Sequence, residues 1–232
     1  MKYLLLIPSF LIFLYCLYKM VKDDYLFIRR NISLEQVFDI GFSITFICLL
    51  FSRLFYYIYH PTSLDNFFVS YFSFQKGGLS LIGAVIGGII GLFFIGKYKK
   101  VPLGRLFDFF MLSFLISLPF GFLSQIIFLK KSEVLIYIIN ALIYLILTIF
   151  FIKVLYPKVL NRTMKEGNLS IYFLIFFAIA SFISSLLHPV KQLLDLVNLQ
   201  NISYVAVLFF SLILLFKQER SSIKGRKPLI KK

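Results

Sequence analysis

The sequence has little charge and little cysteine for a chain of its length. Of its 232 residues, 15% are charged and 60% are hydrophobic, and the mean hydropathy is +0.90. A soluble globular domain carries about 25% charged residues, so this composition excludes an ordinary soluble protein. The two cysteines, Cys16 and Cys48, both lie inside apolar runs, which excludes a disulfide framework and a cysteine metal site.

The chain also lacks a linker rich in proline, glycine or serine, and its sequence shows no internal repeat. Because no such linker divides the chain, we predict one membrane domain, residues 1–217, followed by a basic cytoplasmic tail, residues 218–232. The lack of an internal repeat disfavours a transporter built from inverted repeats. A transporter or scramblase also needs a polar path through the membrane, and Arg53 is the one charge placed well inside an apolar run.

Long apolar runs are what the sequence does contain. About 18 or more apolar residues are needed to cross a bilayer core of roughly 30 Å, and continuous runs of that length favour helices over the short alternating strands of a barrel. We therefore predict an all-α polytopic membrane protein. The seven predicted transmembrane helices are Tyr3–Met20, Leu34–Tyr59, Leu79–Gly96, Leu106–Leu129, Val134–Tyr156, Leu169–Leu187 and Ile202–Phe216.

The distribution of lysine and arginine predicts how the chain is oriented. Most of its 25 basic residues follow the first, third, fifth and seventh spans, and such clusters stay in the cytoplasm. The N-terminus is then outside and the C-terminus cytoplasmic. The net charge of +15 therefore reflects the topology, and we expect the basic residues to contact anionic lipid headgroups. Nucleic acid is not an expected partner.

A glycine-rich segment, KGGLSLIGAVIGG, occupies residues 76–88. Gly83, Gly87 and Gly91 recur every four residues, a spacing that lets another helix approach closely. Helix packing is the favoured interpretation of these three. Gly77 and Gly78 precede the span, where an irregular turn is tolerated only if protein or a polar cavity covers it.

A few polar residues in or next to the apolar runs are candidate functional groups. Arg53 either faces a cavity or partner, as intramembrane charges usually do, or extends its head to the interface. Asp39 and Asp108 each come near the start of a span, where the helix dipole stabilises a carboxylate. His60 and His188 end spans, and each can complement the dipole or act as a base.

Short motifs along nearly the whole chain resemble the prolipoprotein diacylglyceryl transferase family. SRLFYYIY, residues 52–59, is similar to its Gly-x-Arg-Leu-x-Tyr pattern, with Arg53 and Tyr56 in register. GGLSLIGAVIG, residues 77–87, is similar to Gly-Gly-Leu-Ser-Phe-His-Gly-Gly-Leu-Ile-Gly and is the most specific match. GRLFD, residues 104–108, and the Gln200/Ser203 pair also resemble family segments.

Several family positions differ. The histidine of the glycine-rich motif is Ile82 here. The family's Gly-Arg-x-Gly-Asn-Phe-x-Asn-Gly-Glu aligns with GFLSQIIFLK from Gly121, so that Phe122 replaces the arginine, Gln125 the first asparagine and Lys130 the glutamate. In the sixth span, SFISSLLH replaces a stretch with two arginines and a glutamate.

The resemblance implies a multi-pass protein of the bacterial cytoplasmic (inner) membrane that uses no cofactor and no metal. It implies transfer of a diacylglyceryl group from phosphatidylglycerol to the cysteine thiol of a prolipoprotein signal peptide. The departures leave the catalytic residues unassigned. The implied lipid- or substrate-binding residues are Arg53, Tyr56, Gly77, Gly78, Ser80, Gly83, Gly121 and Gln125.

Two functional hypotheses follow. In a working transferase, Arg53 is the remaining cation, Lys76 and Lys130 stand in for lost arginines, and Tyr56 and Gln125 hydrogen-bond the substrates. The alternative is a catalytically degenerate homologue that binds lipid or signal peptide without turnover. Phenylalanine and serine cannot grip a phosphate as a guanidinium does, which favours the alternative.

Overall fold

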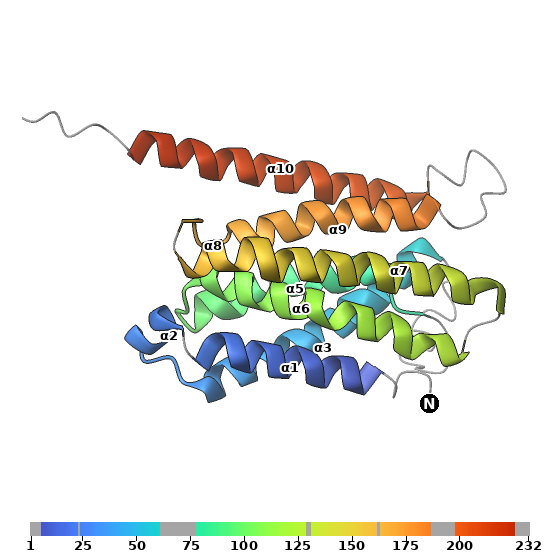
Figure 1. Ribbon diagram of the computed structural model, residues 1–232, viewed down its shortest axis with the longest axis horizontal. Coiled ribbons are helices and arrows are strands. Elements are labelled where there is room, and N and C mark those ends of the chain that lie inside the picture. The colour runs from blue at the N-terminus through green and yellow to red at the C-terminus, as the bar shows by residue number, and fades with distance from the viewer. Residues whose placement is uncertain are drawn as a thin grey trace, which may run out of the picture.

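A computed structural model describes residues 6–22, 24–60, 78–128, 131–161, 163–186 and 198–225. These residues form helices and turns, with no strand among them (Figure 1). The predicted all-α fold is confirmed. The elements are α1 (Ile7–Lys22), α2 (Tyr25–Arg29), α3 (Leu34–Tyr59), α5 (Leu81–Tyr98), α6 (Leu103–Gln125), the 3₁₀ turn η3 (Ile126–Phe128), α7 (Lys131–Phe150), the π-turn η4 (Phe151–Leu155), α8 (Tyr156–Leu160), α9 (Asn168–Leu186) and α10 (Leu199–Gly225).

Six helices in the described ranges are long and apolar enough to cross a membrane. They begin at Leu34, Leu81, Leu103, Val134, Asn168 and Leu199. The first predicted span corresponds to α1, whose 16 residues reach about 24 Å, less than the roughly 30 Å of a bilayer core. The chain is thus a multi-pass membrane protein, while the seventh span and the orientation of the termini stay predictions.

Helix α6 is the centre of the bundle. It packs between α1 and α7 and also contacts α5 and α9, and it carries the largest share of buried residues among the six spans. Helix α10 lies at the edge of the bundle on α9 (Figure 1). Its outward face is apolar, with Phe209, Phe210 and Phe216 more than half exposed, as expected of a helix that borders lipid.

Glycines of α5 allow it to pack closely against α3. A Cβ atom on Gly83 would lie 2.6 Å from the carbonyl oxygen of Phe51, and one on Gly87 would lie 2.6 Å from the Cβ of Phe51. Both distances are shorter than van der Waals contact, so the two backbones approach this closely only because no side chain intervenes. The predicted packing role of the glycine face is confirmed.

Candidate functional site

A cavity of ≈ 440 Å³ lies within the bundle, a volume typical of small-molecule sites. It occupies the end where α5, α7 and α10 begin and where α3, α6 and α9 end. Helix α1 contributes Ser9 near its N-terminus. Under the predicted topology this end faces the outside of the cell.

Tyr56, near the end of α3, lines the cavity and packs on the turn before α5. A Cβ atom on Gly78 would lie 2.5 Å from the Cε2 atom of Tyr56, so the ring rests where only glycine leaves room. The His60 ring stacks on the Tyr56 ring, with the two ring centroids 4.7 Å apart. Its Nδ1 lies 3.2 Å from the Tyr56 carbonyl oxygen. Because a carbonyl only accepts, Nδ1 carries the proton in this contact and Nε2 of the neutral ring is an acceptor.

Ser80 fixes the start of α5 at the edge of the cavity. Its Oγ accepts a hydrogen bond from the Gly83 backbone N–H at 3.4 Å, which makes it the N-cap of the helix. The Ser52 hydroxyl donates to the Ser80 carbonyl at 2.7 Å, and the Ser80 N–H donates to the Ser52 carbonyl at 3.0 Å. Both serines line the cavity.

The end of α6 supplies Gly121 and Gln125 to the lining. A Cβ atom on Gly121 would lie 3.4 Å from Ser9 Oγ, an ordinary contact, so this glycine leaves a small space without a close backbone approach. The predicted residues Tyr56, Ser80, Gly121 and Gln125 are therefore brought together around one cavity.

The other predicted residues lie elsewhere. Arg53 is buried, at 3% exposure, with its guanidinium carbon 5.7 Å from the Tyr57 ring centroid, and it is not among the lining residues. Gly83 packs on α3, and Ile82 is fully buried in the apolar core. Gly77 falls outside the described residues, as do Lys76, Lys130 and His188. The binding roles of all the predicted residues, the cavity-lining ones included, stay predictions.

Several lining residues were not predicted. Tyr137, Asn140 and Tyr144 come from α7, and Ser181 and Ser184 come from α9. The Tyr144 and Ser181 hydroxyl oxygens are 2.8 Å apart and hydrogen-bonded. Asn140 could have been predicted from the sequence, because it is a lone amide within a long apolar run. Polar groups in a membrane span are usually functional.

The lining mixes apolar side chains with polar ones, and no charged side chain is among its residues in the part of the chain that the structure describes. Its polar members carry hydroxyl, amide or imidazole groups, and none is an aspartate, glutamate, lysine or arginine. Those described ranges also bring together no three His, Cys, Asp or Glu side chains that could hold a metal ion. The cavity can therefore orient a ligand by neutral hydrogen bonds, and His60 Nε2 is one of the acceptors it offers.

A second, apolar cavity of ≈ 200 Å³ adjoins the first between α1, α3, α5 and α6. Phe13, Ile44, Val85 and Leu92 are among the residues that line it. Ser9, Thr45 and Ser117 are shared with the first cavity, along with some apolar residues. The first space carries most of the polar groups and the second is almost entirely apolar, a difference that suits an amphiphile.

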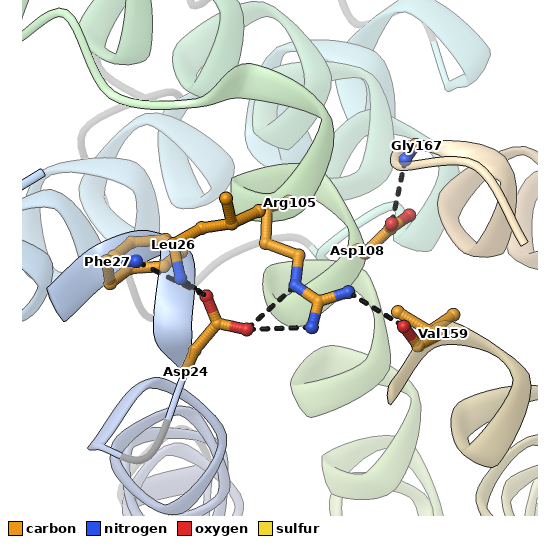
Figure 2. A network of polar contacts seen from close by, with 7 residues as sticks. All are labelled: Asp24, Leu26, Phe27, Arg105, Asp108, Val159 and Gly167. Atoms are coloured by element: carbon orange, nitrogen blue, oxygen red, sulfur yellow. Dashed lines mark hydrogen bonds and ion pairs between the residues drawn. The ribbon is translucent and has the colours of Figure 1, made fainter. Parts of the chain in front are cut away.

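Arg105 and Asp108, the charged residues of GRLFD, lie near the start of α6, away from the cavity, and Figure 2 shows their contacts. Arg105 donates to the Asp24 carboxylate through Nη2 at 2.7 Å and Nε at 2.9 Å, and its Nη1 donates to the Val159 carbonyl at 3.3 Å. The same Asp24 accepts from the backbone N–H groups of Leu26 and Phe27 and caps α2.

Asp108 caps a helix other than its own. Its carboxylate accepts hydrogen bonds from the Gly167 N–H at 2.7 Å and the Ser170 N–H at 2.9 Å, at the start of α9. The expectation that Asp108 stabilises the first turn of its own span is wrong, because α6 begins at Leu103, before the predicted Leu106. Asp39 likewise lies beyond the first turn of α3 and pairs with Lys99 at 3.7 Å.

Comparison with known proteins gives one family match. A family model described as prolipoprotein diacylglyceryl transferase matches residues 3–127, a range that runs from α1 through α6 and contains Tyr56, Ser80, Gly121 and Gln125. No curated protein matches the chain. The match confirms the resemblance found in the sequence motifs.

Proposed function

Since the chain belongs to the prolipoprotein diacylglyceryl transferase family, we propose that it binds a diacylglyceryl lipid of the membrane in the cavity between α3, α5, α6 and α7. Family membership gives a diacylglyceryl transferase-like function in general. The finer proposal is that this member holds the lipid without transferring it. Its proposed location is the bacterial cytoplasmic membrane.

The observation that carries the proposal is the pairing of the two cavities. The larger has hydroxyl and amide groups among its apolar side chains, the smaller is almost entirely apolar, and Ser9, Thr45 and Ser117 line both. A lipid has the same division, because its headgroup hydrogen-bonds and its chains do not. A cavity that matches both parts is a lipid site on chemical grounds.

The chemistry of transfer supports binding over turnover. In the transfer, the thiol sulfur forms a C–S bond to the glyceryl carbon, the C–O bond to phosphate breaks, and the phosphate leaves with the bonding electrons. A base must take the thiol proton, and a cation must stabilise the leaving phosphate. Loss of one such stabiliser costs about 10²–10³ in rate. The described lining contains neutral groups, and Arg53 lies outside it.

A second candidate function is transfer itself, and the observation that favours it is His60. Its imidazole lines the cavity, stacks on Tyr56 and holds Nδ1 toward a carbonyl, which leaves Nε2 to accept a proton. A lipobox cysteine reaching the cavity would give up its proton there. Phosphatidylglycerol would then be the donor and a prolipoprotein signal peptide the acceptor.

One pair of measurements tests both candidates on the full chain. Native mass spectrometry of the purified protein with added dioleoyl phosphatidylglycerol and dioleoylglycerol should show one bound lipid, and Tyr56→Ala should weaken it. Tyr98→Ala is the matched control, because Tyr98 is 87% exposed and lies outside the cavity. Absence of any bound lipid would refute the proposal.

Transfer is measured in cells depleted of their own transferase, through the mass shift of a lipobox peptide. We expect no adduct while the protein is inserted in the membrane. A diacylglyceryl adduct that disappears with His60→Ala would establish the second candidate instead.

A further inference from the structure

Four hydroxyl groups of the lining already donate their only hydrogen to the protein. Ser9 Oγ donates to Ser117 O at 2.8 Å, and Thr45 Oγ1 donates to Gly41 O at 2.8 Å. Ser52 Oγ donates to Ser80 O at 2.7 Å, and Ser117 Oγ donates to Phe114 O at 2.8 Å. A hydroxyl has one hydrogen and two acceptor lone pairs. These groups therefore offer acceptors to a ligand.

Asn140 adds an acceptor that is itself in need of a donor. The residue is 5% exposed and lines the cavity, and its Oδ1 is buried without a hydrogen-bond partner in the described structure. A buried carbonyl oxygen left without a donor is costly, and most such oxygens in proteins have one. A ligand hydroxyl that donates to Oδ1 would supply the missing partner.

The position of the acceptors sets the size of the headgroup. Ser9, Thr45 and Ser117 line both cavities, so these three residues lie where the more polar cavity adjoins the apolar one. A ligand group bonded to them sits directly beside the start of an acyl chain. A hydroxyl on the glyceryl unit meets this requirement, whereas an extended headgroup reaches past the junction.

From these contacts we infer that the cavity selects an uncharged, hydroxyl-bearing diacyl lipid of the 1,2-diacylglycerol class over a phosphate-bearing one. This inference rests on the proposed lipid-binding function and specifies its ligand. The ligand hydroxyl donates its hydrogen to Asn140 Oδ1, the buried lining oxygen left without a donor in the described structure. Phosphate oxygens only accept, so they meet lone pairs at the junction, and a buried anion needs a paired charge to offset its lost hydration.

Three probes with the same two oleoyl chains isolate the headgroup. They are 1,2-dioleoylglycerol, its 3-O-methyl ether, which has no hydroxyl hydrogen, and dioleoylphosphatidate, which carries a phosphate in place of the hydroxyl. We expect the purified full chain to bind dioleoylglycerol about 3- to 10-fold more tightly than the methyl ether, the effect of one hydrogen bond. Phosphatidate should bind more weakly than dioleoylglycerol.

A pair of asparagine variants tests the assigned contact. Asn140→Ala should lower the affinity for dioleoylglycerol about 3- to 10-fold and leave that for the methyl ether nearly unchanged. The matched control is Asn168→Ala, because Asn168 Oδ1 is also buried without a partner in the described structure but the residue lies at the start of α9, outside the cavity. It should change neither affinity.

The outcomes separate the inference from the proposed function. Equal binding of dioleoylglycerol and its methyl ether, or tighter binding of phosphatidate, overturns the inference while lipid binding stands. Failure of all three probes and of dioleoyl phosphatidylglycerol overturns the proposed function with it. The comparison of probes uses the unmutated chain, so it does not depend on how any variant folds.

Discussion

Ser52 and Ser80 exchange two hydrogen bonds across the α3–α5 contact: the Ser52 hydroxyl donates to the Ser80 carbonyl, and the Ser80 N–H donates to the Ser52 carbonyl. Residues 28 positions apart in the sequence are thereby held together at the edge of the cavity. The reciprocal pair anchors the first turn of α5, on which the shape of the lining depends.

Removing the Ser52 hydroxyl should loosen this edge. Ser52→Ala is expected to lower the free energy of unfolding by about 0.5–1.5 kcal/mol, measured by circular dichroism during denaturation in detergent. The Ser80 carbonyl keeps its bond from the Ala84 N–H, which limits the cost. Ser124→Ala is the control, since its Oγ bonds only the Gly121 carbonyl of its own helix, and an equal loss there would contradict the assigned contact.

The close approach of α3 and α5 predicts an asymmetry between two glycines. Gly83→Ala places a methyl group 2.6 Å from the Phe51 carbonyl oxygen and should destabilise the protein by about 1–3 kcal/mol, as overpacking does. Gly121→Ala meets its nearest atom at 3.4 Å and should change stability by less than about 0.5 kcal/mol. Thermal unfolding of the two variants checks the order, and a reversed order would refute the packing role.

The Asp24–Arg105 ion pair should contribute far more to the free energy of unfolding than the Asp39–Lys99 pair. Its side chains are 3% and 9% exposed, and removal of one partner from a buried pair costs about 3–5 kcal/mol. We therefore expect Asp24→Asn to destabilise strongly. Asp39→Asn breaks a pair whose side chains are 70% and 34% exposed and should cost at most about 1 kcal/mol. Chemical denaturation of both variants gives the comparison.

Gly78→Ala should affect ligand binding more than stability. The added methyl would lie 2.5 Å from Tyr56 Cε2, and a side-chain ring can turn aside where a backbone cannot. We expect displacement of the ring from its place at the cavity, with a drop in lipid affinity of about 3- to 10-fold, the size of one lost hydrogen bond or ring contact. Native mass spectrometry measures the affinity, and unfolding in parallel should show little change. A large stability loss with normal binding would contradict this reading.

The sequence predicted the spans well where local signals marked their ends. Leu34–Tyr59 was predicted at its observed bounds, because Ser33 caps its start and His60-Pro61 follows its end. Helix α10 runs to Gly225, past the predicted Phe216, because hydropathy reports the apolar part of a helix and not the polar turns that continue it.

The site was predicted only in part, because tertiary packing brings its residues on α3, α5 and α6 together with those on α7 and α9. The family motifs pointed to Tyr56, Ser80, Gly121 and Gln125, which lie in the matched residues 3–127. Asn140 and Ser181 come from helices beyond that range, and nothing local indicates that they face the same space. Asp24 and Arg105 are 81 positions apart in the sequence, and hydrophobic periodicity, which is a local pattern, does not predict that they pair.

The salt bridge of Arg105 and the capping by Asp108 sit at one end of α6, about 24 Å along the helix from Gly121. Together they bind the α1–α2 corner, α8 and the start of α9 to a single helix. At this end α1 and α9 are held to α6 by charge-assisted hydrogen bonds, whereas at the cavity end α1 is held by the neutral Ser9–Ser117 hydrogen bond. The bundle is therefore fixed more strongly at its charged end, and we expect any separation of helices that admits a lipid to occur at the cavity end.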